Sequence, residues 1–290
     1  MTATPRFVYG LVALGLGWLS VSAAEDWESL FNGRDLTGWD SYLGAPYDVA
    51  SKRYEGDPIG LNQDPHNVFT VVKVDGQPTV RISGQDFGGI ASAREFENYH
   101  LRLQFKWGTL KHPPRTEVVR DSGVLYHSVG APASGSRFWM TSQEFQVQEG
   151  DCGDYWRVGA DIALSIRCRE ETGPDGKLQY RYDPAGRTVT FDLDNPGPRS
   201  CKKSPDAEKP SGQWNTLDLY CYGTSAMHVM NGVVVMILHD SKLTDGDGDY
   251  RPHPKGKIQI QSEGAEIFYR DIKIRPIDRL PDLQVVGSLP

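Results

Sequence analysis

Residues 143–151 read Gln143-Glu144-Phe145-Gln146-Val147-Gln148-Glu149-Gly150-Asp151. Apolar Phe145 and Val147 alternate with polar residues, which is the period of a β-strand with two different faces. The apolar face belongs to a core. The polar face carries a carboxylate and two amides, from Glu144, Gln146 and Gln148, which either face water or supply a sugar site with hydrogen-bonding groups and one base.

The same alternation recurs along the chain, and no long helical period occurs between Trp27 and Pro276. The 31 glycines and 19 prolines punctuate the sequence every few residues, as in all-β proteins. Asn231-Gly232 predicts a tight hairpin within residues 228–235. Further strands are predicted at His100–Trp107, Ser122–His127, Trp214–Tyr222, Gly256–Gly264 and Ile267–Ile274, the last as the partner of the strand before it.

These strands predict an all-β sandwich of two antiparallel sheets, a jelly roll with one concave polar face. In such a fold, neighbouring strands turn their acid and amide side chains toward a common hollow while their apolar sides form the interior. The domain is predicted to span residues 25–276, followed by an irregular C-terminal tail at 277–290.

The first 24 residues have the pattern of a secretory signal peptide. The apolar run Phe7–Leu19 is followed by small residues up to Ala24, and the run is too short for a comfortable membrane span. We therefore expect a secreted or periplasmic protein without a membrane span after cleavage. A net charge of -7 argues against nucleic acid and anionic membranes as partners. The oligomeric state is left open.

The four cysteines suit an oxidising compartment. An even count in an exported protein favours two disulfides with three alternative pairings. The cysteines are Cys152, Cys168, Cys201 and Cys221. No C-x-x-C spacing occurs, which argues against a zinc ribbon or a thioredoxin-like site.

An ordered set of short motifs resembles the 3-keto-disaccharide hydrolase family, also described as 3-keto-glucoside 1,2-lyases and 3-keto-2-hydroxy-glucal hydratases. Leu30–Trp39 resembles the opening LFNGxDLxGW of that family. The other matches, in chain order, are Asp121-Ser122-Gly123-Val124, Glu144-Phe145-Gln146, Gly212-Gln213-Trp214-Asn215, Met230-Asn231-Gly232, Gly256–Gln261 and Tyr269-Arg270-Asp271-Ile272. The resemblance implies a single concanavalin A-like jelly roll that is exported and acts on an oxidised, 3-keto glucoside or disaccharide. His127 departs from the family pattern, which commonly has Arg there, and Glu263 stands where many members have His.

The chemistry implied by the resemblance needs a base and an acid. A ketone at C3 of a glucoside acidifies the C2 proton, so cleavage can run by proton abstraction and β-elimination, followed by water addition to the resulting enone. We expect Glu144 to be the base, with His127 and Glu263 completing the catalytic set. A divalent metal ion held by these three residues is a candidate cofactor, although no ligand spacing is diagnostic and no cofactor is certain. The residues predicted to bind substrate are Gln146, Gln148, Glu149, Asp151, Trp156, Gln261 and Arg102.

Two other functions fit the same residues. Amides and aromatic rings suffice for a non-catalytic, lectin-like carbohydrate-binding module. The spacing Glu144-x-Gln146-x-x-Glu149 also resembles the E-x-D-x-x-E of laminarinase-like glycoside hydrolases, with Gln in place of the central Asp. Retaining hydrolysis needs two carboxyl groups about 5–5.5 Å apart, and a regular strand would turn Glu149 to the face opposite Glu144.

Overall fold

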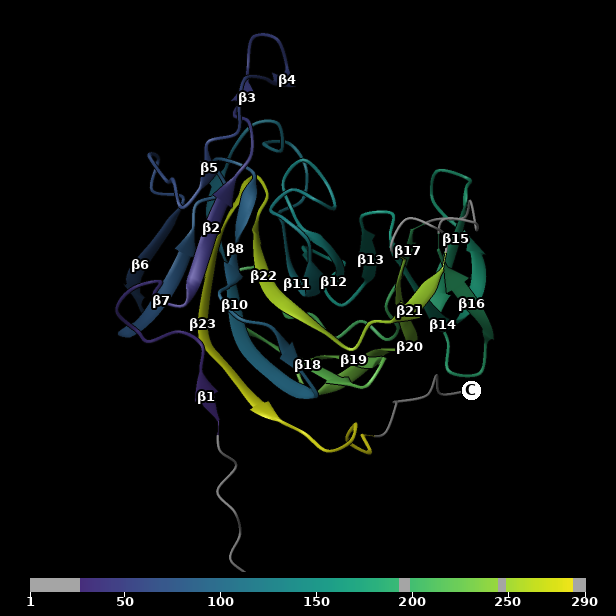
Figure 1. Cartoon of the computed structure of the whole chain (residues 1–290). Helices are drawn as coiled ribbons and strands as arrows, with labels where there is room; N and C mark the ends of the chain where they lie inside the picture. Colours follow the sequence, from purple (N-terminus) through teal and green to yellow (C-terminus); the bar gives the residue numbers. More distant parts are fainter. Residues whose placement is uncertain (1–26, 193–198, 245–248, 284–290) are drawn as a thin grey trace, which may run out of the picture.

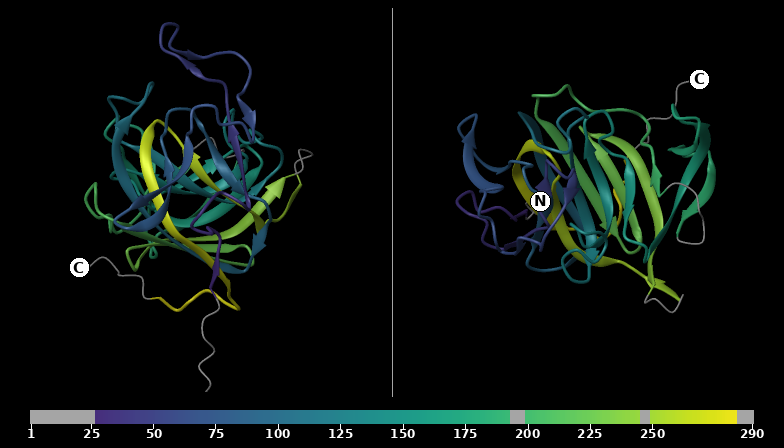
Figure 2. Two further views of the ribbon diagram at one scale, coloured as in Figure 1. Left: turned by 90° about the vertical axis from the view of Figure 1, so that its left-hand side faces the viewer. Right: turned by 90° about the horizontal axis from the view of Figure 1, so that it is seen from above.

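The computed structural model describes residues 27–192, 199–244 and 249–283, and within these ranges the chain forms β-strands and no helix. Two large antiparallel sheets pack face to face, as Figure 1 and Figure 2 show from three directions. This arrangement confirms the predicted all-β jelly-roll sandwich. The predicted signal peptide, residues 1–24, lies outside the described residues. None of the described segments is a helix long and apolar enough to cross a membrane.

The larger sheet has twelve strands among the described residues. Its main path runs β15 (Leu178–Tyr182), β14 (Ile162–Thr172), β20 (Val233–Thr244), β19 (Ser225–Met230), β18 (Asn215–Tyr222), β10 (Tyr99–Lys111), β23 (Ala265–Pro276), β7 (Gln77–Ile82) and β6 (Phe69–Val74). Three more strands pair beside this path: β1 (Glu28–Ser29) with β23, β16 (Arg187–Phe191) with β14, and β21 (Tyr250–Pro252) with β20.

The second sheet has nine strands in the same ranges and carries the predicted polar face. Its order is β17 (Ser200–Cys201), β13 (Tyr155–Val158), β12 (Thr141–Gln148), β11 (Asp121–Val129), β22 (Lys255–Ser262), β8 (Gly88–Ser92), β2 (Trp39–Leu43) and β5 (Gly60–Leu61), with β9 (Phe96–Glu97) beside β22. A small hairpin of β3 (Tyr47–Asp48) and β4 (Arg53–Tyr54) projects beyond one end of the sandwich (Figure 1).

The core forms from the apolar faces of both sheets. Phe145 and Val147 of β12 are fully buried in the same cluster as Leu101, Leu103 and Phe105 of β10. The alternation that predicted these strands therefore separates inside from outside as expected. Because the side-chain period of a strand is two, this burial also fixes which residues of β12 face outward.

The predicted pairing of the last two strands is wrong. Strand β22 pairs with β11 and β8 in the nine-stranded sheet, whereas β23 pairs with β10 and β7 in the other sheet. The chain crosses between the sheets at Glu263 and Gly264, and Gly264 takes a φ of 84° there. Both strands bury an apolar face in the same core, one from each sheet. A short polar link between two alternating strands has the sequence pattern of a hairpin, so the alternation does not distinguish a hairpin from a crossing between sheets.

The cysteine prediction is also not met. All four cysteines are buried and free, so neither of the two expected disulfides is formed. Cys168 and Cys201 come near each other, with their sulfur atoms 3.3 Å apart.

The predicted Asn-Gly hairpin is present between β19 and β20. Asn231 and Gly232 take φ values of 51° and 84°, which a primed turn requires. The Asn231 side chain also ties the turn to its surroundings: its oxygen accepts from the Thr216 backbone N–H, and its NH₂ group donates to the Ala207 carbonyl and to the Asn215 side-chain oxygen. The residue therefore has a conformational role and a hydrogen-bonding role.

Two substitutions separate these roles. Asn231→Gly keeps access to positive φ but loses three hydrogen bonds, so we expect a loss of roughly 2–3 kcal/mol in the free energy of unfolding. Asn231→Ala adds the strain of a left-handed backbone and should lose about 1 kcal/mol more. Urea denaturation measures both values. Wild-type stability in Asn231→Gly would contradict the hydrogen-bonding role.

Candidate active site

A pocket of about 240 Å³ opens on the outer face of the nine-stranded sheet. Strand β12 contributes Glu144, Gln146 and Gln148, so its whole polar face reaches the pocket. The other lining side chains that matter for its chemistry are Arg115, Asp121, Trp139, Trp156, Arg157, Arg199, Gln261 and Glu263. Three carboxyl groups, three guanidinium groups, three amides and two indoles thus surround one hollow.

Strand register aligns these groups in rows. Directly opposed residues of an antiparallel sheet point to the same face. Glu144 of β12 opposes Trp156 of β13, and Gln148 opposes Asp121 of β11. Glu144 and Asp121 are therefore held on rigid strands by the pairing of the backbone, whereas Glu263 directly follows β22 at the link to β23.

Gly123 leaves the space in which the central groups meet. It lies on β11 opposite Gln146, and a Cβ atom placed on it would collide with the side-chain oxygens of Glu144 and Gln261. Both side chains therefore lie across the glycine, one from each neighbouring strand. Any larger residue at this position would push the acid and the amide apart.

The three carboxyl groups share an environment that disfavours their charged forms. Burial raises the pKa of Glu144 well above its usual range, and the charge of Asp121 adds to the increase. Burial and the charges of Asp121 and Glu144 do the same to the pKa of Glu263, whose side chain is 16% exposed. Burial raises the pKa of Asp121 to about 6. At neutral pH the pocket therefore retains protons that ordinary carboxyl groups would have lost.

Two arginines oppose this effect. A nitrogen of Arg115 lies 2.6 Å from a carboxylate oxygen of Asp121, and the other terminal nitrogen lies 3.6 Å from Glu263. Arg199 lowers the pKa of Glu144 and stands over the Trp156 ring at 5.3 Å. Gln148 donates to the same Asp121 oxygen at 2.7 Å. The two guanidinium groups limit the increase in the pKa of Asp121 and of Glu144 without abolishing it.

Several polar atoms at this site have no hydrogen-bond partner within the described part of the chain. They include the side-chain oxygens of Gln146 and Gln261 and one oxygen of Asp121, all buried. Unpaired buried acceptors cost stability unless something binds them. Nitrogens of Arg115 and Arg157, which line the same pocket, are also buried without a partner in the described ranges, so the site suits a ligand that both donates and accepts hydrogen bonds.

Six of the ten predicted site residues line the pocket. They are Glu144, Glu263, Gln146, Gln148, Trp156 and Gln261. The structure thus places these side chains together, although it does not test the role of any one of them.

His127 does not lie with Glu144 and Glu263. A regular strand would turn His127 to the face of Gly123 and Leu125, but the β11 register shifts between Tyr126 and Val129 and His127 takes a φ of 49°. This bulge turns its ring into an aromatic environment beside Tyr99, Tyr126 and His253. Burial there lowers the pKa of His127 to about 3, which corresponds to a neutral ring.

The other three predicted residues also lie elsewhere. Glu149 follows the end of β12 and pairs with Arg120 at 3.0 Å. Asp151 pairs with Lys202 at 3.0 Å in the turn after β12. Arg102 belongs to β10 of the opposite sheet, where it donates to Asp218 at 2.5 Å. Each therefore has a charged partner away from the pocket.

Sequence reasoning missed Asp121, Arg115, Arg157 and Arg199 as site residues. Asp121 precedes Gly123 by two positions on the same strand, so extending the alternation would have found it. Arg115 and Arg199 come from loops and no periodic signal marks them. Within the described ranges, no group of three or more His, Cys, Asp or Glu side chains is arranged to hold a metal ion, and the predicted ligands His127, Glu144 and Glu263 do not meet.

Comparison with known proteins identifies a family model that matches this chain. The model of the 3-keto-alpha-glucoside-1,2-lyase-like domain matches residues 26–275, which confirms the resemblance seen in the motifs. No curated protein matches the chain.

Solved structures with a similar fold are distant in sequence. A proposed glycosyl hydrolase from Parabacteroides distasonis has 19% identity over 88% of this chain and 95% of its own, with a TM-score of 0.47. A carbohydrate-binding module from Bacillus subtilis has 10% identity over 71% and 91%, with a TM-score of 0.40. The β-glucanase of Bacillus licheniformis has 9% identity over 87% and 97%, with a TM-score of 0.37. Similarity at this level carries no conclusion about the activity of this chain.

The raised pKa of Glu144 predicts a stability effect with a definite sign. The folded state binds this proton more tightly than the unfolded state, so stability falls as pH rises from about 4.5 through the folded pKa. We expect Glu144→Gln, which cannot ionise, to melt at least about 2 °C higher than wild type at pH 8, or roughly 1 kcal/mol for a chain of this size. The difference should vanish near pH 4.

Glu171→Gln is the matched control for this measurement. The hydrogen bond from Arg181 lowers the pKa of Glu171, so this carboxylate stabilises the fold above its unfolded pKa and its loss should reduce the melting temperature at pH 8. Calorimetry at pH 4 and pH 8 compares the variants. A Glu144→Gln protein less stable than wild type at pH 8 would contradict the pKa assignment.

Proposed function

This chain belongs to the 3-keto-alpha-glucoside-1,2-lyase-like family, and from that premise we propose that it cleaves 3-keto-glucosides by β-elimination and hydrates the resulting 3-keto-2-hydroxy-glucal. Family membership makes the chain a carbohydrate-active protein. The oxidised substrate, the reaction and the site residues are the proposal. Export to the periplasm or the cell exterior is part of it and rests on the predicted signal peptide.

The observation that carries this proposal is the group of three carboxyls with raised pKa values around one pocket. Proton transfer is fastest when the catalytic pKa lies near the working pH, and burial with like charges is a common way to raise a carboxyl pKa. Asp121, Glu144 and Glu263 meet this condition. A binding module does not require such groups, because neutral amides and aromatic rings bind sugars without the cost of buried acids.

The elimination step uses two of the acids. Ionised Glu144 takes the proton from C2, and the electrons of the C2–H bond form an enolate with the ketone at C3. The enolate then expels the oxygen at C1, and protonated Glu263 gives its proton to that leaving oxygen. Arg199 and Arg115 supply positive charge beside the acids while the negative charge develops. The product is the conjugated enone.

Hydration returns both acids to their starting states. Water adds its oxygen to C1 and gives one proton to ionised Glu263. Protonated Glu144 returns its proton to C2, so that atoms and charge balance over the cycle. Asp121, held by Arg115 and Gln148, does not need to contact the substrate in this scheme. Its charge raises the pKa of both glutamates.

Replacing the proposed base separates this reaction from the alternatives. Glu144→Gln should lower the rate of sugar release from a 3-keto-disaccharide by at least about 100-fold, because an amide cannot accept the C2 proton. Binding should persist, since shape and hydrogen bonding are largely kept. Chromatography of released sugar and calorimetric titration measure the two effects.

Glu149→Gln is the control, because Glu149 is a neighbouring carboxylate paired with Arg120 away from the pocket. We expect activity within about threefold of wild type. A strong loss in Glu149→Gln together with hydrolysis of unoxidised β-glucan would instead support the laminarinase-like function. Tight binding of plain glycans without turnover of the keto sugar by wild type would support the lectin-like function.

The pH dependence of catalysis tests the coupling between the acids. Burial is the largest cause of the raised pKa of Glu144, and the negative charge of Asp121 is the second largest. Asp121→Asn removes that charge, so the Glu144 base should ionise at lower pH and the acidic limb of the kcat/KM profile should move to lower pH. Profiles between pH 4 and pH 9 measure this shift. A limb that stays in place or moves upward would refute the coupling, and Glu149→Gln should leave it unmoved.

A further inference from the structure

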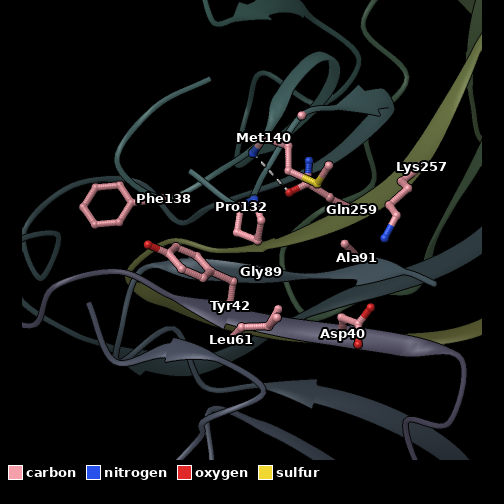
Figure 3. Close-up of a pocket in the computed structure, with 11 residues that line it drawn as sticks. Asp40, Tyr42, Leu61, Gly89, Ala91, Pro132, Phe138, Met140, Lys257 and Gln259 are labelled. Atoms are coloured by element: carbon pink, nitrogen blue, oxygen red, sulfur yellow. Dashed lines mark hydrogen bonds between the residues drawn. The ribbon is translucent and has the colours of Figure 1, made fainter. Parts of the chain in front are cut away.

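A second hollow of about 140 Å³ lies on the same face of the nine-stranded sheet, over β22, β8 and β2 (Figure 3). We propose that it binds the far end of the leaving group, and that this end is an apolar aromatic ring. The inference rests on the proposed function, because it assigns a second part of the same substrate. We call this hollow the leaving-group pocket.

One row of opposed residues runs from the leaving-group pocket to the pocket that holds Asp121, Glu144 and Glu263, which we call the carboxyl site. Asp40 opposes Ala91, Ala91 opposes Gln259, Gln259 opposes Leu125, and Leu125 opposes Glu144. Opposed residues share a face, so both pockets open to the same side of the sheet. Leu125 and Gln259 in the middle of this row are buried, at 0% and 4% exposed, so a ligand that reaches both pockets must pass outside the loop that covers them.

The loop of residues 130–140, between β11 and β12, forms the boundary between the two pockets. Trp139 lines the carboxyl site, whereas its neighbours Phe138 and Met140 line the leaving-group pocket. The Trp139 indole N–H donates to the Gly88 carbonyl of β8 at 2.7 Å, which fixes the indole at the junction. The geometry thus places an aromatic ring beside the path that an extended leaving group would follow.

The lining of the leaving-group pocket favours an apolar ring over a sugar. Tyr42, Leu61, Phe138 and Met140 form its sides, and the small residues Gly89 and Ala91 leave room at its floor (Figure 3). Its two charged side chains, Asp40 and Lys257, lie together at the end away from Phe138. Its amide is already engaged: the Gln259 oxygen accepts from the Met140 N–H, and its NH₂ group donates to Ser128. The amide oxygens at the carboxyl site, by contrast, have no partner within the described residues. Sugar hydroxyls therefore find free acceptors at the carboxyl site, whereas the end of the leaving-group pocket away from Asp40 and Lys257 suits an apolar ring.

The spacing of the strands sets the size of the leaving group. Gly123 of β11 marks the centre of the carboxyl site, and Gly89 of β8 lies two strands away across β22. Two strand spacings amount to about 10 Å. A leaving group of two linked aromatic rings spans this distance, whereas a methyl group does not.

Two variants test the leaving-group pocket with two substrates. Ala91→Leu fills the floor, and Leu61→Ala removes a wall residue that is 52% exposed and so contributes little to folding. With a 3-keto-glucoside of a two-ring phenol, we expect kcat/KM to fall at least about tenfold in Ala91→Leu and about threefold in Leu61→Ala. With methyl 3-keto-glucoside, both variants should stay within about twofold of wild type. Ala185→Leu, an exposed turn residue of the other sheet, is the control for both substrates.

Calorimetric titration with the unoxidised two-ring aryl glucoside keeps this inference separate from the proposed function. We expect wild type to bind this glucoside and both pocket variants to bind it more weakly, whether or not the keto sugars are turned over. Absence of turnover with this binding pattern would overturn the proposed function alone. Equal effects on both substrates, no effect of either variant, or tighter binding of a glucoside with a sugar-terminated leaving group would overturn the aromatic leaving-group pocket.

Discussion

The burial of three carboxyl groups on one sheet face is the constraint on which the rest of the site depends. Removing a carboxylate from water costs free energy, and each of these groups raises the cost for the others. Asp121, Glu144 and Glu263 can remain together only because some of them hold protons and because Arg115 and Arg199 supply opposite charge. A cluster that is costly for the fold is suited to moving protons.

The opposite face of the same strands makes this cluster possible. Phe145, Val147, Ile258 and Ile260 are fully buried against the other sheet. A shift of one residue in β12 or β22 would turn the acids into the core and the apolar residues into water, so that register is strongly fixed. Hydrophobic burial thereby provides the rigidity that the acids need, and Gly123 supplies the space in which they meet.

The sequence predicts those features of the fold and the site that depend on residues close together in the chain, and it misses those that depend on distant residues. The outward positions of Glu144, Gln146 and Gln148 were predictable, because alternation within one strand is a local property. The position of His127 was not, because a bulge at positive φ reverses the face and leaves no mark in the alternation. The separation of β22 from β23 was not predictable either, since both strands bury the same kind of face. Arg115 and Arg199 lie in loops, where spatial proximity to the acids depends on the whole fold.

The division between strands and loops also explains how one sheet can hold two different environments. Strands β11, β12 and β22 fix the acids and amides, while loops supply the cations and the wall at Trp139. On one side of that wall the amide oxygens of Gln146 and Gln261 have no partner within the described residues, and on the other side Gln259 is engaged by the loop itself. The hydrogen bonds that the loop makes therefore decide which part of the sheet face stays available to a polar ligand. Changes in the loop of residues 130–140 can alter the leaving-group pocket without moving strands β11 and β12, which carry Asp121 and Glu144.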